Sequence, residues 1–230
     1  MSLSPELYCP LERKRAVIIV NMQNDSFFAK DDVYTTKIHH FIPRLKGLIP
    51  YFRKDTHIFW VCTHMDQKAR FYQEGTRGAE VWRELHDMVD EVKDSIVIKP
   101  QYSAFDQTSL LTDLRKNLIT DVYLCGCLTN VDVYSTALDA VPHGLRVTVI
   151  EDCLGYRSEV KHKQALGQMV EIMGVDKVDS DEIVNEYGGV PMPDMEPLDI
   201  PLNELCMNTD ENTTGDGRMV AATKTGSTAS

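Results

Sequence analysis

The sequence has few basic residues for its size and no long run of them. Its 230 residues include 24 Lys and Arg against 35 Asp and Glu, which gives a formal net charge of −11. Nucleic acids and anionic membrane surfaces are bound through basic patches. We therefore expect no nucleic acid and no membrane among the partners of this protein.

Long apolar runs are also missing. No segment approaches the roughly 20 apolar residues of a membrane-spanning helix, and the first residues lack the charged and apolar regions of a secretory signal. Six cysteines are scattered along the chain, and four of them fall in or beside apolar runs. This usage is typical of free, buried thiols in a reducing compartment, so we expect a cytoplasmic protein. Cys125-Gly-Cys127 is then part of a core strand rather than a metal or redox pair.

What the sequence does contain is an alternation of strand-like and helix-like segments. The apolar runs expected as strands are 16–22, 57–63, 94–100, 121–127, 146–151 and 177–184. The amphipathic segments expected as helices are 36–54, 108–118, 130–141 and 158–173, with prolines at the ends or at a kink of the first. The order predicts a doubly wound, mostly parallel α/β sheet with helices on both faces.

The domain organisation follows from a change in composition near residue 187. Residues 1–187 are expected to form the α/β domain, within which 64–94 is a polar excursion over the sheet edge. Prolines at 191, 193, 197 and 201 exclude regular structure in an arm over 188–207. Residues 208–230 are rich in Thr, Ser, Gly, Asp and Asn, which predicts a disordered tail.

Functional residues in such folds lie beyond the carboxyl ends of the strands. This rule places Asn21, His64, Lys99 and Asp132 along one edge of the sheet. The clearest corner is the stretch 122–140, where an apolar strand runs through Gly126 and Thr129 into a helix. A helix beginning there favours an anion, and Asp132 occupies its first turn.

Three segments resemble motifs of the isochorismatase-like hydrolase family, which includes isochorismatases, nicotinamidases and related cysteine amidohydrolases. They read Asn21-Met-Gln-Asn-Asp-Ser-Phe27, Lys99-Pro-Gln-Tyr-Ser-Ala-Phe105 and Gly126-Cys-Leu-Thr-Asn-Val-Asp-Val-Tyr-Ser-Thr-Ala137. The resemblance spans roughly residues 15 to 185. It implies the three-layer α/β/α fold of that family, a small-molecule substrate and a homo-oligomer.

The chain departs from the family pattern at two of three catalytic positions. The cysteine enzymes of the family use an Asp-Lys-Cys triad, and the matching residues here are Asn21, Lys99 and Asp132. A carboxylate is a poor nucleophile toward amides, so a thioester route is not expected. Asp132 is instead predicted to be an acid or base, Lys99 its electrostatic partner and Asn21 a hydrogen-bonding orienter. The resemblance also implies a cis peptide at Cys127-Leu128 that aims the Leu128 and Asp132 N–H groups at an oxyanion.

Other residues complete the candidate site. Phe27, Trp82 and Tyr102 are expected to form an aromatic wall for a planar or cyclic substrate, and core packing explains Phe105 equally well. His64 is expected to line the pocket. Thr63-His-Met-Asp66 is similar to the metal-binding Asp-x-His of nicotinamidases, but the order is reversed and two ligands at most are present. We predict no metal and no cofactor, and we expect Asp25 to make local backbone hydrogen bonds.

Three functions remain open at this stage. The first is a repurposed enzyme that acts on a small cyclic or carbonyl-containing metabolite by hydrolysis, elimination or cyclisation. The loops around Cys125 and Cys153 also look like those of family members from filamentous fungi, some of which serve secondary metabolism. The second is a pseudoenzyme that binds a ligand or an assembly partner, and the third is a hydrolase that uses Cys127.

Overall fold

The structure is a computed structural model, and it describes residues 13–29, 32–33 and 38–191. All of these belong to the first of two compact units of the chain, residues 1–198. Most of the expected Pro-rich arm and the whole expected tail lie outside the described residues. The proposed domain boundaries therefore stay a prediction.

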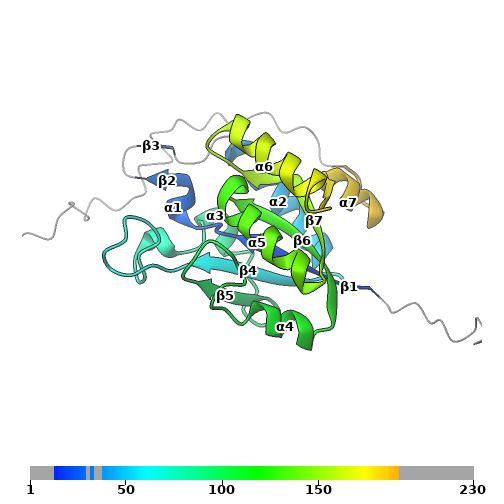
Figure 1. Cartoon of the computed structure of the whole chain (residues 1–230), viewed down its shortest axis with the longest axis horizontal. Coiled ribbons are helices and arrows are strands. Elements are labelled where there is room, and N and C mark those ends of the chain that lie inside the picture. The colour runs from blue at the N-terminus through cyan, green and yellow to red at the C-terminus, as the bar shows by residue number, and fades with distance from the viewer. Residues whose placement is uncertain (1–12, 30–31, 34–37, 192–230) are drawn as a thin grey trace, which may run out of the picture. The chain divides into compact units, whose positions relative to one another are not determined.

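A six-stranded sheet forms the centre of the described chain (Figure 1). Its strands are β1 Lys14–Val20, β4 His57–Thr63, β5 Ser95–Lys99, β6 Ile119–Cys127, β7 Arg146–Gly155 and β8 Asp176–Val178. Their order is β5-β4-β1-β6-β7-β8, and every neighbouring pair is parallel. Two short strands, β2 Phe28–Ala29 and β3 Asp32–Val33, form a separate antiparallel pair. The doubly wound α/β class expected from the sequence is confirmed.

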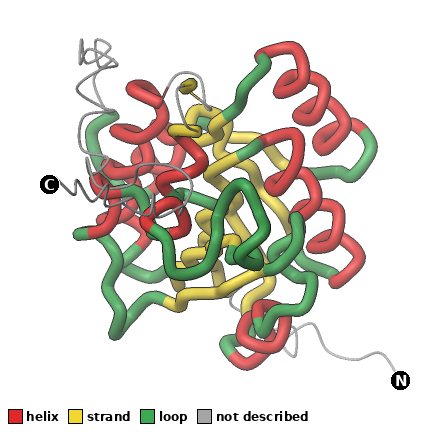
Figure 2. The backbone as a smooth tube through the Cα atoms, turned by 90° about the vertical axis from the view of Figure 1, so that its left-hand side faces the viewer, coloured by secondary structure: helices red, strands yellow, loops and turns green. Residues whose placement is uncertain are grey.

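Helices cover both faces of the sheet, as Figure 2 shows. One face packs on α4 Leu110–Lys116, α5 Tyr134–Ala140 and α6 Glu159–Glu171, and the other on α2 Ile38–Phe52 and α7 Ser180–Glu186. The short elements are α1 Asn24–Phe27, η2 Arg77–Ala79, α3 Arg83–His86, the π-helical turn η3 Thr129–Val133 and η4 Val141–His143.

Burial follows the position of each strand in the sheet. Residues 16–20 of the central strand β1 are all at most 1% exposed, which explains their unbroken apolar sequence. The edge strand β5 alternates instead: Val97 and Lys99 are buried, whereas Ile96 and Ile98 are 49% and 43% exposed. Lys99 therefore points to the face that Val97 shares with α4 and α5.

Two details differ from the sequence-based expectations. The segment 177–184 is not one strand: β8 ends at Val178, and α7 begins at Ser180 behind a capping box of Asp179 and Glu182. Helix α2 contains both Pro43 and Pro50 within its bounds. The excursion 64–94 is irregular, as expected, apart from η2 and α3.

Candidate functional site

The strand order reverses direction between β1 and β6, which makes a topological switch point there. The chain progresses from β1 toward β4 and β5 on one side, and from β6 toward β7 and β8 on the other. Ligands of doubly wound sheets bind at such a switch point, outside the carboxyl ends of the strands. Figure 2 looks toward this edge. Asn21 follows β1 and the 127–132 corner follows β6, so both lie at the switch point.

A buried ion pair spans this edge. Lys99 Nζ donates hydrogen bonds to Asp132 Oδ1 at 2.6 Å and to the Gln101 carbonyl oxygen at 2.8 Å. The Lys99 side chain is 0% exposed and that of Asp132 is 11% exposed. Because β4 and β1 lie between β5 and β6, and each strand spacing is about 4.8 Å, the gap between the two strands is longer than a lysine side chain. The turn η3, which carries Asp132 beyond the end of β6, therefore bridges part of it.

Burial and pairing act on the lysine in opposite directions. Burial lowers the pKa of Lys99 from its ordinary value, and the neighbouring Asp132 carboxylate partly offsets this effect. Removing two charges from water costs free energy unless they are paired and hydrogen-bonded. An ammonium group with a lowered pKa beside a carboxylate is the kind of pair that active sites hold for proton transfer.

Asn21 carries a hydrogen-bond donor that the described protein does not satisfy. Its backbone has φ of 49°, a left-handed conformation that asparagine tolerates better than most residues. Its Oδ1 accepts a hydrogen bond from Thr63 Oγ1 at 2.8 Å. Its Nδ2 is buried and has no hydrogen-bond partner among the described residues. A buried donor of this kind costs about 1–3 kcal/mol when it stays unpaired.

The corner after β6 is shaped by close backbone contact. Gly126 has φ of 109°, and a Cβ atom there would lie 2.1 Å from the Val20 carbonyl oxygen. The Cys127–Leu128 peptide bond is cis, as the resemblance implied. The turn η3 follows and places Asp132, and Thr136 Oγ1 donates to the Asp132 carbonyl oxygen at 2.7 Å. The same hydroxyl accepts from the Ala104 N–H, which ties the corner to the loop after Lys99.

The expected substrate-binding residues do not all share one environment. Phe27 and Trp82 are 0% and 4% exposed, and their rings contact each other at 5.1 Å in an edge-on arrangement. Leu128 is 7% exposed, whereas Tyr102 is 62% exposed. His64 is half-buried. Its backbone N–H donates to the Lys99 carbonyl oxygen, which places it next to the lysine of the ion pair. Phe105 packs elsewhere, on His143.

The sequence did not reveal the role of Gln23, whose hydrogen bonds connect the segments around the switch point. Gln23 is 0% exposed, accepts from the Thr63 N–H and donates to the carbonyl oxygens of Thr63 and Ala79. It thereby joins the ends of β1 and β4 to the excursion. A glutamine inside a strand-end motif gave a positional signal, but its partners are 40 and 56 residues away.

Asp25 binds a backbone N–H group, as expected, but that of a residue 47 positions away and not a local one. Its Oδ2 accepts from the Tyr72 N–H at 2.6 Å, and a Cβ atom at Gly78 would lie 2.3 Å from that oxygen. Burial raises the pKa of Asp25, and the Tyr72 hydrogen bond partly opposes the rise. The carboxylate thus fastens the excursion to α1 next to the switch point.

The described residues do not fit the metal site of the resemblance. Asp66 accepts from the Lys68 N–H within its own turn, and no group of three His, Cys, Asp or Glu side chains within 13–29, 32–33 and 38–191 could hold an ion. No helix in the described chain is long and apolar enough to span a membrane.

Comparisons with known proteins show the family of the chain and agree with its fold. Residues 15–180 match the sequence model of the Isochorismatase domain, and Asn21, Lys99 and Asp132 all lie within the match. The uncharacterized isochorismatase family protein YaaI of Bacillus subtilis is 22% identical over 179 residues, which are 75% of this chain and 97% of that protein. Maleamate amidohydrolase of Pseudomonas putida is 38% identical over 72 residues, 31% of this chain and 34% of that one. An isochorismatase-like hydrolase from Alkaliphilus metalliredigens has a similar fold, with a TM-score of 0.68 at 24% identity over 76% of this chain and 97% of that chain.

Proposed function

Since the chain belongs to the isochorismatase domain family, we propose that it is a repurposed enzyme that uses Asp132 for acid/base chemistry and needs no cysteine nucleophile. Its substrate is a small cyclic or carbonyl-containing metabolite. The reaction is a hydrolysis, an elimination or a cyclisation, each of which begins or ends with a proton transfer.

The observation that carries this proposal is the buried pair of Lys99 and Asp132. A pair that served stability alone would be replaceable by apolar side chains at little cost. Here the pair lies at the sheet's switch point, and of its two side chains only that of Asp132 reaches solvent, with 11% exposed. A partly exposed proton acceptor that is backed by a buried cation is suited to act on a bound molecule.

The proposed roles of Asn21, Lys99 and Asp132 follow from which of their polar atoms are engaged by other residues and which are not. Asp132 Oδ1 is engaged by Lys99, which leaves Oδ2 to take a proton from the substrate or from a water molecule. The negative charge that develops on a substrate oxygen is met by the N–H groups of Asn21 Nδ2, which has no protein partner among the described residues. Asp132 then returns the proton to the leaving group or to the product.

The cysteines near the switch point are poorly suited to nucleophilic attack. Cys62 is 5% exposed, and burial raises the pKa of its thiol to about 12. Cys127 is 0% exposed and belongs to β6, before the corner. A thiolate is the attacking form of cysteine, so neither residue replaces the cysteine that family enzymes carry at the position of Asp132.

The test compares Asp132→Asn with wild type on a panel of small cyclic and carbonyl compounds that includes maleamate, with products followed by mass spectrometry. The amide keeps the volume of the side chain and an oxygen for Lys99, but it cannot take a proton. We expect turnover to fall by about 100-fold or more. The matched control is Asp176→Asn, at an exposed ion pair with Arg146 on the opposite edge, which should retain full turnover.

Full turnover by Asp132→Asn would contradict the proposal. Tight binding of a panel compound that wild type leaves unchanged would instead support the alternative of a catalytically inactive, ligand-binding protein. Treatment with iodoacetamide should leave turnover intact, and its loss would point to the cysteine route.

A second experiment tests how much of the family scaffold remains. The double variant Asn21→Asp with Asp132→Cys rebuilds the Asp-Lys-Cys triad around the unchanged Lys99. We expect it to gain amidase activity on maleamate that the wild type lacks. Equal activity of the two proteins would show that the exchanged residues do not decide the chemistry.

A further inference from the structure

A buried polar bridge lies behind the corner that carries Asp132. Thr129, the first residue of η3, and His162 of α6 are 0% and 5% exposed. Thr129 Oγ1 donates to the Gly155 carbonyl oxygen at 3.1 Å and lies 2.9 Å from His162 Nδ1. Three segments meet at this hydroxyl: the corner after β6, the end of β7 and helix α6.

Counting protons fixes the state of the histidine. A threonine hydroxyl has one hydrogen to donate and can accept from others. The Gly155 carbonyl oxygen can only accept, so the hydroxyl hydrogen is used there. His162 must then supply the hydrogen of the second bond, and its ring carries a proton on Nδ1. The Tyr156 ring stacks on the imidazole at 4.2 Å with an interplanar angle of 27°, which holds the ring in the required plane.

The bridge acts on the start of the turn that presents Asp132. The Tyr134 N–H donates to the Thr129 carbonyl oxygen, so a shift of Thr129 would move the whole turn. The other end of the turn is held by Thr136, which binds the Asp132 carbonyl oxygen. The bonds of Thr129 Oγ1 to Gly155 and His162 hold the start of the turn in the same way. Asp132 lies between these two points of attachment, and they fix the direction of its side chain.

We propose that His162 is a positioning residue that fixes the corner, and through it Asp132, by donating from Nδ1 to Thr129. The proposal rests on the proposed function, because it assigns His162 to the proton-transfer geometry of Asp132. A histidine suits this place because an Nδ1–H donor and a flat ring for stacking come in one side chain.

The first test is spectroscopic and independent of turnover. Ring ¹⁵N shifts of His162 in the full-length protein should report a proton on Nδ1, and Thr129→Val should change that signal because it removes the acceptor while keeping the shape of the side chain. A bare, accepting Nδ1 in the wild type would overturn the proposal.

The second test uses turnover of the panel substrate of the preceding section. His162→Leu should lower kcat by about fivefold or more with little change in KM. His162→Asn should recover most of the loss, because the amide nitrogen of asparagine is an N–H donor at the same place along the side chain as Nδ1 of histidine. Thr129→Val should match His162→Leu, and the double variant should lose no more than either. Thermal unfolding of each variant verifies that the assay temperature lies below its transition.

The outcomes separate the two proposals. Suppose that Asp132→Asn is inactive. If His162→Leu and His162→Asn then lose the same amount of turnover, or if both keep full turnover, the positioning role is overturned and the proposed function stands. If Asp132→Asn keeps full turnover, the proposed function itself is overturned.

Discussion

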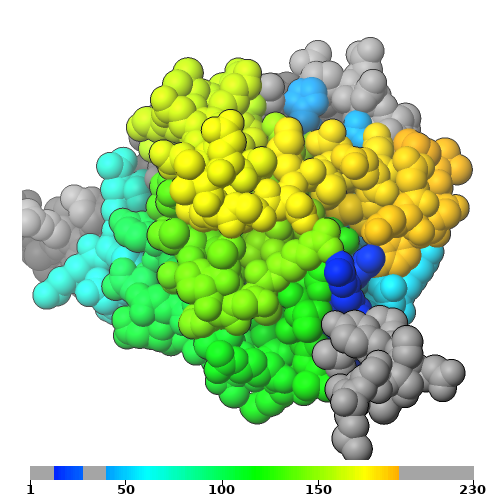
Figure 3. Space-filling view, turned by 45° about the vertical axis from the view of Figure 1, so that its right-hand side comes forward, coloured from blue at the N-terminus to red at the C-terminus, as the bar shows by residue number. Residues whose placement is uncertain are grey.

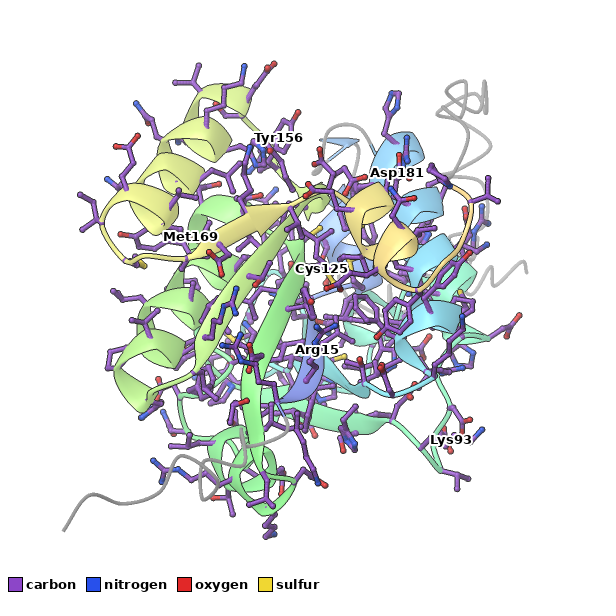
Figure 4. The ribbon with its side chains drawn as sticks, turned by 90° about the vertical axis from the view of Figure 1, so that its right-hand side faces the viewer. Arg15, Lys93, Cys125, Tyr156, Met169 and Asp181 are labelled. Atoms are coloured by element: carbon purple, nitrogen blue, oxygen red, sulfur yellow. The ribbon has the colours of Figure 1, made fainter. Side chains whose placement is uncertain are left out.

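Charged side chains are numerous both at the amino ends of the strands of the central sheet, here called the amino edge, and at the carboxyl ends, here called the carboxyl edge. The ion pairs at the two edges differ in burial. At the amino edge, two hollows of about 550 and 650 Å³ are lined mainly by Arg, Lys, Asp and Glu. Figures 3 and 4 show this side of the molecule, with Arg15 near the centre of Figure 4. Its Arg15–Glu186 pair is open to water: the two groups lie 3.2 Å apart, with 35% and 52% of their side chains exposed. Its Arg53–Asp94 pair is more buried, with 27% and 2% of the side chains exposed. At the carboxyl edge the Lys99–Asp132 pair is 0% and 11% exposed.

The difference shows that neither the size of a hollow nor the number of charges identifies a functional site. Exposed ion pairs contribute little, because water and salt replace them at small cost. A buried pair has no such replacement, and each of its two groups depends on the other. The Lys99–Asp132 pair should therefore respond strongly to single substitutions of a kind that the exposed Arg15–Glu186 pair tolerates.

The largest contrast should come from two glycines with positive φ. Gly126→Ala at the carboxyl edge puts a Cβ atom 2.1 Å from backbone at the β1–β6 pair, and we expect a loss of about 5 kcal/mol or more, or failure to fold. Gly144→Ala, near the start of β7, meets open space, and should cost only about 1–2 kcal/mol. Urea unfolding measures both. Similar losses would mean that φ alone, not the close approach, governs Gly126.

Next in size is the removal of one cation from each edge. Lys99→Met leaves the Asp132 carboxylate buried without its partner, and we expect a loss of about 3–5 kcal/mol in the free energy of unfolding. Arg15→Met breaks an exposed pair and should cost less than about 1 kcal/mol, with a smaller effect in high salt. Chemical denaturation at two salt concentrations checks the comparison. A Lys99→Met protein as stable as wild type would contradict the burial of the pair.

Much of this contrast could be predicted from the sequence. The strands β1, β4 and β6 were recognised because layers on both faces make their sequences continuously apolar, and the doubly wound order then placed Asn21, Lys99 and Asp132 at one edge. The cis peptide followed from the family motif. The strands and their order are encoded by local sequence patterns, whereas the cis peptide was expected only because the motif resembles that of the family.

The remaining features depend on partners distant in sequence. The clamp of Gln23 on Thr63 and Ala79, and the bridge from Thr129 to His162, join segments that no local pattern connects. Trp82 was expected to face a substrate, and its edge-on packing on Phe27 could not be read from composition. Strand β8 has only three residues, too few for a period to distinguish it from the helix that follows.

The smallest expected effect is a difference of sign in pH dependence. Burial raises the pKa of Asp25 at the carboxyl edge, so the folded state binds a proton more readily and stability falls as pH rises through the raised pKa. The hydrogen bond from Lys93 lowers the pKa of Asp90 at the amino edge, so its contribution is present above the ordinary value and lost as pH falls through the lowered pKa.

The measurement is the stability of Asp25→Asn and Asp90→Asn relative to wild type between neutral and acidic pH. As the pH falls, the stability of wild type should rise relative to that of Asp25→Asn. Over the same range, the stability advantage of wild type over Asp90→Asn should disappear. Parallel pH curves for the two variants would remove the distinction between the edges.

The position of Lys99 in the sheet has a further consequence for how long the site stays assembled. Asn21 and the corner belong to the two central strands, but the lysine comes from β5, which has a strand on one side only. Edge elements open locally at a lower free energy than the core. Each such opening would withdraw the cation from Asp132 while β1 and β6 remain paired. Under the proposed function, the fraction of molecules ready to transfer a proton would thus depend on the fraying of this one edge strand, at a free energy below that of global unfolding.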